Sequence, residues 1–169
     1  MSQLLSESER AFFERIRYGA KGFEFKNWAN TFHCKPLYYL APETECEIIE
    51  LVRIAVRHGL PLKPVGSGHS PSDLACTDSI MLNMDKMNRI LAHDPYACTL
   101  TVEAGVRLHQ LNSMLEQRGM ALSSLGSISD QSIAGAIATA THSTGMAFGD
   151  MSSTITHLVI IDGTGRRRE

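Results

Sequence analysis

The chain alternates short apolar segments with amphipathic ones, and this alternation is the feature that most restricts its fold. Five segments have the length and apolar character of strands, at residues 36–42, 60–65, 80–83, 98–103 and 155–161. Residues with helical spacing or small side chains predict helices at 6–18, 42–59, 107–118 and 132–139, and residues 85–91 are expected to form a partly helical turn. With 43% hydrophobic residues, the pattern predicts a globular domain of mixed helices and strands.

Capping signals mark the ends of the predicted helices. Ser6 with Glu9, and Thr44 with Glu47, have capping-box spacing, and Gly59 ends the second helix. The core face expected for that helix consists of Ile48, Leu51, Val52, Ala55 and Val56, and the face of 107–118 consists of Leu108, Leu111 and Leu115. The first helix is expected to be an N-terminal appendage, followed by a connector at 19–31 that is attached to the body by Trp28 and Phe32.

Composition excludes several classes of function. The net charge is −2, from 16 Lys and Arg against 18 Asp and Glu, so no basic field is available for nucleic acid. The four cysteines form no C-x-x-C motif and the seven histidines have no metal-ligand spacing, which favours reduced thiols and predicts no metal site. The N-terminus lacks a secretory signal, which predicts an intracellular protein, and the uncharged stretch 131–149 is too polar to span a membrane.

The strand at 60–65 runs directly into the loop Gly66-Ser-Gly-His-Ser70. Two glycines allow backbone N–H groups to turn toward an anion such as phosphate, although an ordinary turn accounts for them equally well. The loop is not a P-loop, and Pro71 stands where a G-x-G-x-x-G motif has its third glycine. His69 is the reactive side chain of the loop, and it is either a nucleophile or an ordinary hydrogen-bonding histidine.

Small and hydroxylic residues fill nearly all of the stretch between Gly126 and Gly145. This composition predicts backbone lying close to a flat polar ligand, with a tightly packed helix pair as the alternative. A Ser-His-Asp hydrolase site lacks the required G-x-S-x-G turn, and no pair of carboxylates is placed for acid–base work. The sequence therefore nominates no catalytic residue.

Several motifs together resemble the N-terminal, PCMH-type FAD-binding domain of the vanillyl-alcohol oxidase superfamily. They are Lys63-Pro-Val-Gly-Ser-Gly-His-Ser-Pro-Ser-Asp-Leu-Ala-Cys-Thr-Asp78, Val102-Glu-Ala-Gly-Val-Arg-Leu-His-Gln-Leu-Asn112, Gly126-Ser-Ile and Ala138-Thr-Ala-Thr-His142. Within this group, the first motif and Asn27-Trp-Ala-Asn-Thr-Phe32 resemble the sugar-1,4-lactone oxidases, which include the D-arabinono-1,4-lactone and L-gulonolactone enzymes. The resemblance covers about residues 25–165.

The resemblance implies an α+β fold in which two small α+β subdomains hold FAD. Their expected limits are 33–104 and 105–169, after an N-terminal helix and connector at 1–32. In the family the loop at Val65, Gly66, Ser67, Gly68, His69 and Ser70 binds the pyrophosphate, and the second subdomain contacts FAD through Ser127, Ser132, Gly135, Thr139, Ala140, Thr141 and His142. His69 matches the position at which an imidazole nitrogen is bonded to the 8α-methyl carbon of FAD.

The same resemblance implies the reaction. The whole enzyme would oxidise an aldono-1,4-lactone, such as D-arabinono-1,4-lactone in ascorbate-type biosynthesis, and pass the electrons to O₂ to give H₂O₂. Members of the family are often associated with mitochondrial or endoplasmic reticulum membranes. The second subdomain is expected to be truncated and the C-terminal substrate domain absent, so this N-terminal fragment would be inactive alone. The alternatives are a non-catalytic or inactive truncated flavin-binding module, and an alditol- or galactonolactone-type relative.

Two positions depart from the family pattern. Many relatives have Thr-Gly-Thr-His-Gly where this chain has Thr139-Ala-Thr-His-Ser143. If Ala140 or Ser143 requires a positive φ, the loss of glycine there would weaken cofactor binding.

Overall fold

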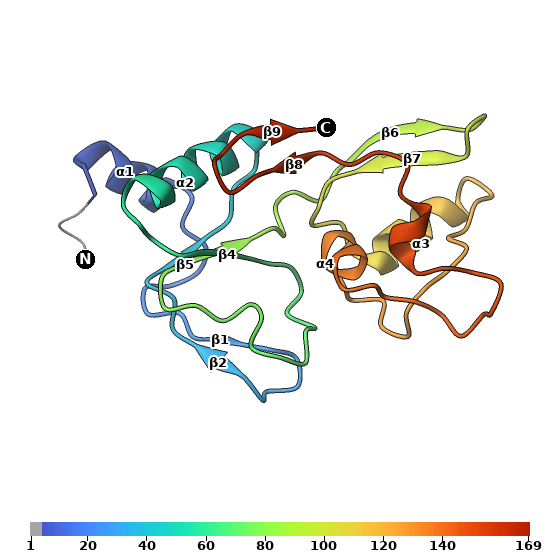
Figure 1. Ribbon diagram of the computed structural model, residues 1–169, viewed down its shortest axis with the longest axis horizontal. Helices are drawn as coiled ribbons and strands as arrows, with labels where there is room; N and C mark the ends of the chain where they lie inside the picture. The colour runs from blue at the N-terminus through green and yellow to red at the C-terminus, as the bar shows by residue number, and fades with distance from the viewer. Residues whose placement is uncertain (1–4) are drawn as a thin grey trace. The chain divides into compact units, whose positions relative to one another are not determined.

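The computed structural model describes residues 5–169 and divides into two compact units (Figure 1). The first unit extends to Lys86 and includes Leu158–Glu169 from the C-terminal end, and the second is Met87–His157. The subdomain limits expected from the family stay predictions, because contact density alone does not define a cofactor-binding subdomain.

A three-stranded parallel sheet forms the centre of the first unit. Its strands are β3 (Tyr38–Leu40), β5 (Ile80–Asn83) and β4 (Leu62–Val65), in the order β3-β5-β4. All four residues of the central strand β5 are buried. Helix α2 (Glu45–Arg57) provides the crossover between β3 and β4 that parallel strands require.

Helix α2 begins as its capping signal predicts, with the Thr44 hydroxyl accepting a hydrogen bond from the Glu47 N–H. Its core face differs from the prediction, because Ile54 is buried and Val56 is 60% exposed. At 100° per residue, Ile54 lies about 60° from the central Leu51, whereas Val56 lies about 140° away. The expected inclusion of Val56 in the core is therefore wrong.

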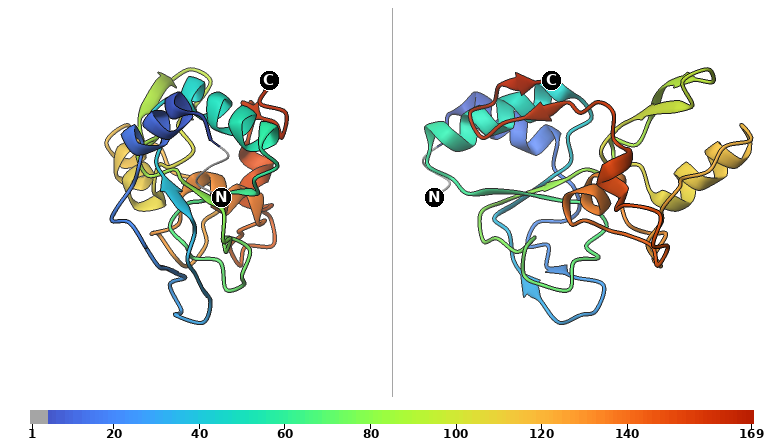
Figure 2. Two further views of the ribbon diagram at one scale, coloured as in Figure 1. Left: turned by 90° about the vertical axis from the view of Figure 1, so that its left-hand side faces the viewer. Right: turned by 45° about the vertical axis from the view of Figure 1, so that its right-hand side comes forward.

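Helix α1 (Glu7–Arg15) has the predicted capping box between Ser6 and Glu9. It is not an appendage but part of the first unit, where it lies beside α2 (Figures 1 and 2). Phe13 is 1% exposed and packs edge-on against Tyr38, with ring centroids 4.8 Å apart. The Glu9 carboxylate joins the two helices, since it also accepts from Arg57 and lies 3.1 Å from Nε2 of His58.

We expect Glu9→Gln to lower the free energy of unfolding at neutral pH by about 2 kcal/mol, because it removes a buried charge that accepts several hydrogen bonds. The hydrogen bond from the Ser6 backbone, followed by those from His58, the Ser6 hydroxyl and Arg57, lowers the pKa of Glu9 from 4.5 to about 2. Its stabilisation is therefore complete above pH 4.5 and is lost as the pH falls toward 2.

Urea denaturation at neutral and acidic pH measures this difference. The difference in the free energy of unfolding between wild type and Glu9→Gln should become smaller as the pH is lowered. Glu7→Gln, an exposed change in the same first turn, serves as the matched control. A gap that stays constant with pH would contradict the role assigned to the Glu9 charge.

The predicted connector at 19–31 contains β1 (Phe25–Lys26), which forms an antiparallel hairpin with β2 (His33–Cys34) just beyond the connector. It is anchored by Phe25, which is 6% exposed, whereas Trp28 and Phe32 are 57% and 38% exposed. Neither side chain is buried, but Trp28 does attach the connector to the body, since its N–H donates to the Gly68 carbonyl and its ring stacks on His69. The expectation is therefore confirmed for Trp28 and stays a prediction for Phe32. Hydrophobic periodicity could not predict which residues of this irregular segment are buried.

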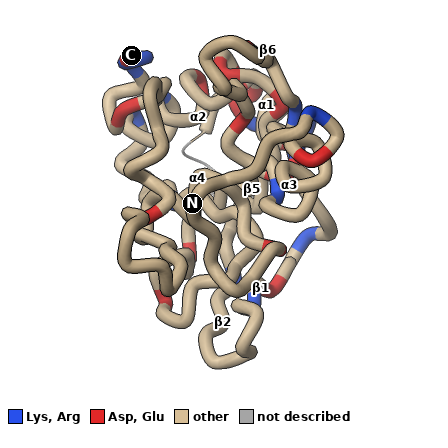
Figure 3. Tube along the Cα trace, turned by 90° about the vertical axis from the view of Figure 1, so that its right-hand side faces the viewer, with Lys and Arg blue, Asp and Glu red and all other residues tan. Residues whose placement is uncertain are grey.

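The C-terminal strand is shorter than the predicted 155–161. Only β8 (Ile160–Ile161) pairs, with β9 (Arg167–Arg168), around the expected Asp162–Gly163 turn. The hairpin lies on α2, where Arg167 forms an ion pair with Glu45 at 3.1 Å. Figure 3 shows Lys and Arg scattered along the trace, with a short cluster at this C-terminal hairpin.

The second unit combines a hairpin with short helices. Strands β6 (Ile90–Asp94) and β7 (Thr99–Val102) are antiparallel, followed by α3 (Leu108–Glu116), α4 (Ile133–Ala138) and the 3₁₀ helix η1 (Met151–Thr154). Strand β6 begins within the segment that was expected to be a turn. Its pairing with β7 supplies hydrogen bonds that the local sequence does not show.

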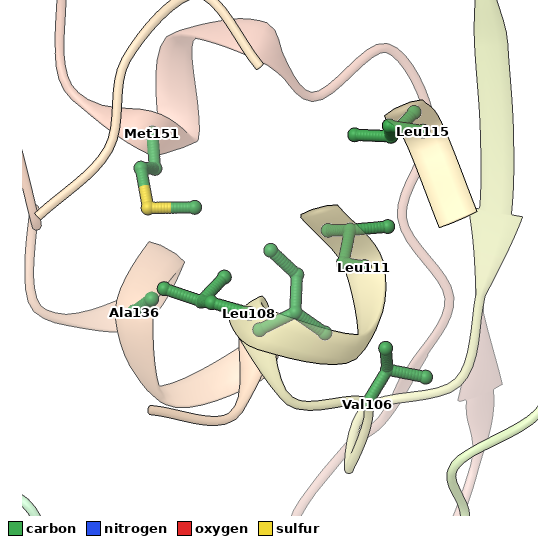
Figure 4. Packing of buried hydrophobic residues seen from close by; sticks show 7 residues of the cluster. Val106, Leu108, Leu111, Leu115, Ala136 and Met151 are labelled. Atoms are coloured by element: carbon green, nitrogen blue, oxygen red, sulfur yellow. The ribbon is translucent and has the colours of Figure 1, made fainter. Parts of the chain in front are cut away.

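The core of the second unit confirms the predicted face of α3. Leu108, Leu111 and Leu115 are all at most 4% exposed and pack with Val106, Ala136 and Met151 (Figure 4). The small side chain of Ala136 lets α4 lie close to α3. Throughout residues 5–169, no helix has both the length and the apolar character needed to cross a bilayer.

Candidate functional site

The loop Gly66–Ser70 leaves the carboxyl end of β4 and is held by the β1–β2 hairpin. The Trp28 N–H donates to the Gly68 carbonyl at 3.0 Å, and Nδ2 of Asn27 donates to the Ser70 carbonyl at 3.1 Å. Asn27 is buried, with 4% of its surface exposed. We call these two hydrogen bonds from the hairpin the clamp on the loop. Ligands of parallel sheets bind beyond the carboxyl ends of the strands, which is where this loop lies.

The clamp uses the carbonyl groups of the loop and leaves its amides available. Within residues 5–169, the N–H groups of Ser67, Gly68, His69 and Ser70 donate no hydrogen bond to the protein. Consecutive unpaired amides form the kind of concave donor set that binds phosphate oxygens. The structure therefore supports an anion site along 67–70.

Gly68 is required by the clamp for two reasons. Its φ is +70°, and a Cβ at this position would lie 3.3 Å from the ring of Phe25. A larger residue would be strained and would also press on the core of the hairpin. The second glycine of the loop is thus explained by its contact with β1, not by an ordinary turn alone.

His69 has a buried ring nitrogen without a partner. Nδ1 accepts and donates no hydrogen bond among the described residues, although it is shielded from solvent. The imidazole stacks on Trp28, with ring centroids 5.8 Å apart and an interplanar angle of 24°. Buried polar atoms are almost always paired, so this ring nitrogen is a polar atom that the described part of the protein leaves unsatisfied.

The second candidate region lines a shallow, open pocket of about 300 Å³ within the second unit, called the cavity below. The cavity contains the predicted residues Ser127, Thr139, Ala140, Thr141 and His142, together with Gly126, Ile128 and Gln131, which sequence reasoning missed. Ser132 and Gly135 are not among the lining residues, since they lie at the start of α4 and within it. All three missed residues lie inside the candidate stretch 126–145, but only Gly126 is small, so composition gave no signal for Ile128 or Gln131 individually.

Ala140 adopts a backbone conformation that normally belongs to glycine. Its φ is +52°, and the Thr141 N–H donates to the Ala136 carbonyl at 3.1 Å, which makes Ala140 the left-handed residue of a Schellman motif after α4. Loss of the family glycine was expected to weaken cofactor binding if the residue at this position requires a positive φ. Ala140 does have a positive φ. Ser143, the other departure, is not among the positive-φ residues.

We expect Ala140→Gly to raise the free energy of unfolding by about 1 kcal/mol, because it removes the left-handed strain of a Cβ-bearing residue. Thermal unfolding measures the gain. Ser143→Gly is the matched control and should give no gain, since the Ser143 hydroxyl accepts a hydrogen bond from the Gly145 N–H. Equal effects at both positions would contradict the assignment of strain to Ala140.

The clamp residues Asn27 and Trp28 were not nominated as site residues. The sequence did contain a signal for these two residues, because the motif at 27–32 contributed to the family resemblance. Only the fold shows that they contact the loop at 66–70.

A loop of free amides at a strand end in the first unit and a pocket of small residues in the second are each features expected of a protein that binds a nucleotide cofactor. Residues 36–169 match the family described as FAD binding domain, and the chain belongs to that family.

The chain is similar to curated lactone oxidases. It is 41% identical over 148 residues to L-gulonolactone oxidase of Mus musculus, covering 88% of this chain and 34% of that protein. It is also 41% identical over 148 residues to D-arabinono-1,4-lactone oxidase of Kluyveromyces lactis, covering 85% of this chain and 28% of that protein. The chain thus spans about a third of the length of these relatives.

Among solved structures, cholesterol oxidase from Brevibacterium sterolicum superposes with a TM-score of 0.65 at 21% identity, covering 70% of this chain and 24% of that chain. This likeness concerns the fold, and it confirms the expected α+β architecture of the PCMH type.

The described residues fit FAD on their own geometry. In the first unit, the amides of 67–70 suit its pyrophosphate. In the second unit, the pocket beside Ala140 is lined largely by small and polar residues that a cofactor can approach closely. The family and the geometry therefore agree on the cofactor.

Proposed function

We propose that this chain is the FAD-binding part of an aldono-1,4-lactone oxidase and that His69 carries the FAD covalently. The observation that supports the covalent attachment is the buried Nδ1 of His69, which has no partner in the described structure. The similarity to lactone oxidases over most of the chain supports the substrate class.

The residues of the chain have distinct roles in this proposal. The amides of 67–70 bind the pyrophosphate, and Trp28 holds the imidazole of His69 in one orientation by stacking on it. Ser127, Ser132, Gly135 and the run Thr139–His142 are the residues of the second unit that the family resemblance assigns to the cofactor. Bound FAD would supply the hydride acceptor for the C–OH group of the lactone, with O₂ taking the electrons to give H₂O₂.

Acid precipitation of the purified protein tests the covalent bond. We expect yellow colour and flavin fluorescence to remain with the polypeptide and, after trypsin digestion, to follow the peptide 58–86, which contains His69. Flavin that is released completely by acid would overturn the covalent attachment, while leaving a noncovalent FAD site in place.

A peroxide-release assay tests the substrate class in the protein that carries this chain. We expect H₂O₂ production with D-arabinono-1,4-lactone or L-gulono-1,4-lactone and less with alditols. Bound FAD without turnover of any aldonolactone would favour a non-catalytic flavin-binding module. Preference for an alditol or for galactonolactone would assign the chain to those relatives instead.

The proposal includes an intracellular location with association to a mitochondrial or endoplasmic reticulum membrane. Cell fractionation with organelle markers tests both parts, and recovery of the protein from the medium would contradict them.

A further inference from the structure

Two cysteines lie opposite each other beside the cofactor loop. In the parallel pairing of β3 with β5, Tyr38 pairs with Ile80 and Leu40 with Leu82. The same difference in residue number between paired residues places Cys34 opposite Cys76, just before β3 and β5 begin. Backbone hydrogen bonds from Leu37 to Asp78 and from Tyr38 to Ser79 extend the pairing in this direction.

Side-chain contacts show that the extension reaches the two thiols. The Thr77 N–H donates to Sγ of Cys34 at 3.4 Å, which places this sulfur within about 6 Å of the adjacent Cα of Cys76. Both cysteines pack against the same buried cluster, which includes Phe25 and Val65. Neighbouring strands lie about 4.8 Å apart, and disulfides join Cα atoms separated by about 4.4–6.8 Å.

We propose that Cys34 and Cys76 form a reversible disulfide that fastens the segment after His69 to the β1–β2 hairpin. In this structure both are half-buried free thiols. The segment 70–76 follows the anion loop directly, and the hairpin already clamps that loop through Asn27 and Trp28. The disulfide would therefore add a covalent tie to the clamp.

The electrostatics of the pair support this assignment. Burial raises the pKa of the Cys76 thiol, and the hydrogen bond and charge of Cys34 raise it further. The raised pKa keeps the Cys76 sulfur protonated at neutral pH. The Thr77 N–H donates to Sγ of Cys34 and would stabilise negative charge there, so the proposal takes Cys34 as the thiol that reacts first and Cys76 as the one that resolves the intermediate.

The reaction requires a two-electron oxidant, for which we name a hydroperoxide. Hydrogen peroxide oxidises the Cys34 thiol to a sulfenic acid and is itself reduced to water. The Cys76 sulfur then attacks the sulfenic sulfur, its proton joins the leaving hydroxide, and a second water forms. Two thiols and one peroxide thus give one disulfide and two waters. The pairing depends on the geometry alone and does not rest on the lactone reaction.

Peptide mapping after peroxide treatment tests the proposal directly. The protein is reduced, freed of reductant, treated with hydrogen peroxide without any lactone, blocked with N-ethylmaleimide and digested after Lys, Arg and Glu. Because Lys–Pro bonds resist cleavage, each cysteine falls on its own peptide: Cys34 on 27–43, Cys46 on 46–47, Cys76 on 58–86 and Cys98 on 90–103.

We expect the link between 27–43 and 58–86 to form first and to disappear on reduction. The melting temperature should rise by about 5–10 °C on oxidation, as for other disulfides that close long loops. A Cys46→Ser, Cys98→Ser double variant, which lacks only exposed thiols, should keep both effects, and Cys76→Ser should lose both.

Absence of this link, overoxidation of both cysteines, or equal pairing of Cys34 with Cys46 would overturn the proposal. Mapping of the wild-type protein decides this even if Cys76→Ser does not fold. The peptide 58–86 contains both Cys76 and His69, so its mass reports the disulfide and the flavin separately. Failure of one proposal is therefore distinguishable from failure of the other.

Discussion

Protein with His69 replaced by alanine is expected to lose all acid-stable flavin while remaining folded. The imidazole is the only side chain of the loop 66–70 with a nitrogen that can form the proposed C–N bond to the flavin, because the others are glycine and serine. Nδ1 makes no hydrogen bond within the described residues, so its removal leaves no protein group unpaired. The melting temperature should therefore change little in the cofactor-free protein.

Flavin fluorescence of the acid-precipitated polypeptide measures this outcome. His142→Ala is the matched control, since His142 lines the cavity of the second unit and is not assigned a covalent bond. It should keep the acid-stable flavin. Retention of acid-stable flavin by His69→Ala, or its loss only in His142→Ala, would transfer the attachment to another residue.

The second large effect is expected at Gly126. A Cβ at this position would lie 2.5 Å from Cγ2 of Thr141 and 3.4 Å from Oε1 of Gln131, both of which line the cavity. Threonine has few χ1 alternatives, so the overlap must move the backbone. We expect Gly126→Ala to cost about 1–3 kcal/mol of stability and to lower FAD occupancy.

A double-mutant cycle separates this overlap from other effects of alanine. Thr141→Ser removes Cγ2 and keeps the hydroxyl, so the Gly126→Ala, Thr141→Ser protein should recover most of the lost stability. Gly163→Ala is the control, because a Cβ there meets no atom within 4 Å and its φ is not positive. Strictly additive losses in the double variant would contradict the proposed overlap.

Local chemistry made several elements predictable. Ser6 with Glu9 and Thr44 with Glu47 fixed the starts of α1 and α2, and the spacing of the leucines in α3 identified its core face. These signals act within one helical turn, so they depend little on the rest of the chain.

Other elements depended on distant partners. Strand β6 exists because β7 pairs with it, and its start lies within a segment whose local pattern predicted a turn. Trp28 lies on the surface and stacks on a histidine 41 positions away, a contact that no local pattern reports.

The sequence by itself determined the family, the cofactor class and the loop 65–70, because these follow from a short run of residue types. The tertiary structure alone decided that Asn27 and Trp28 clamp this loop, that Nδ1 of His69 is buried and unpaired, and that Ala140 has a left-handed backbone. Whether a side chain is buried, which groups it pairs with and whether its φ is positive all depend on the path of the whole chain. The residue types within one segment do not specify that path.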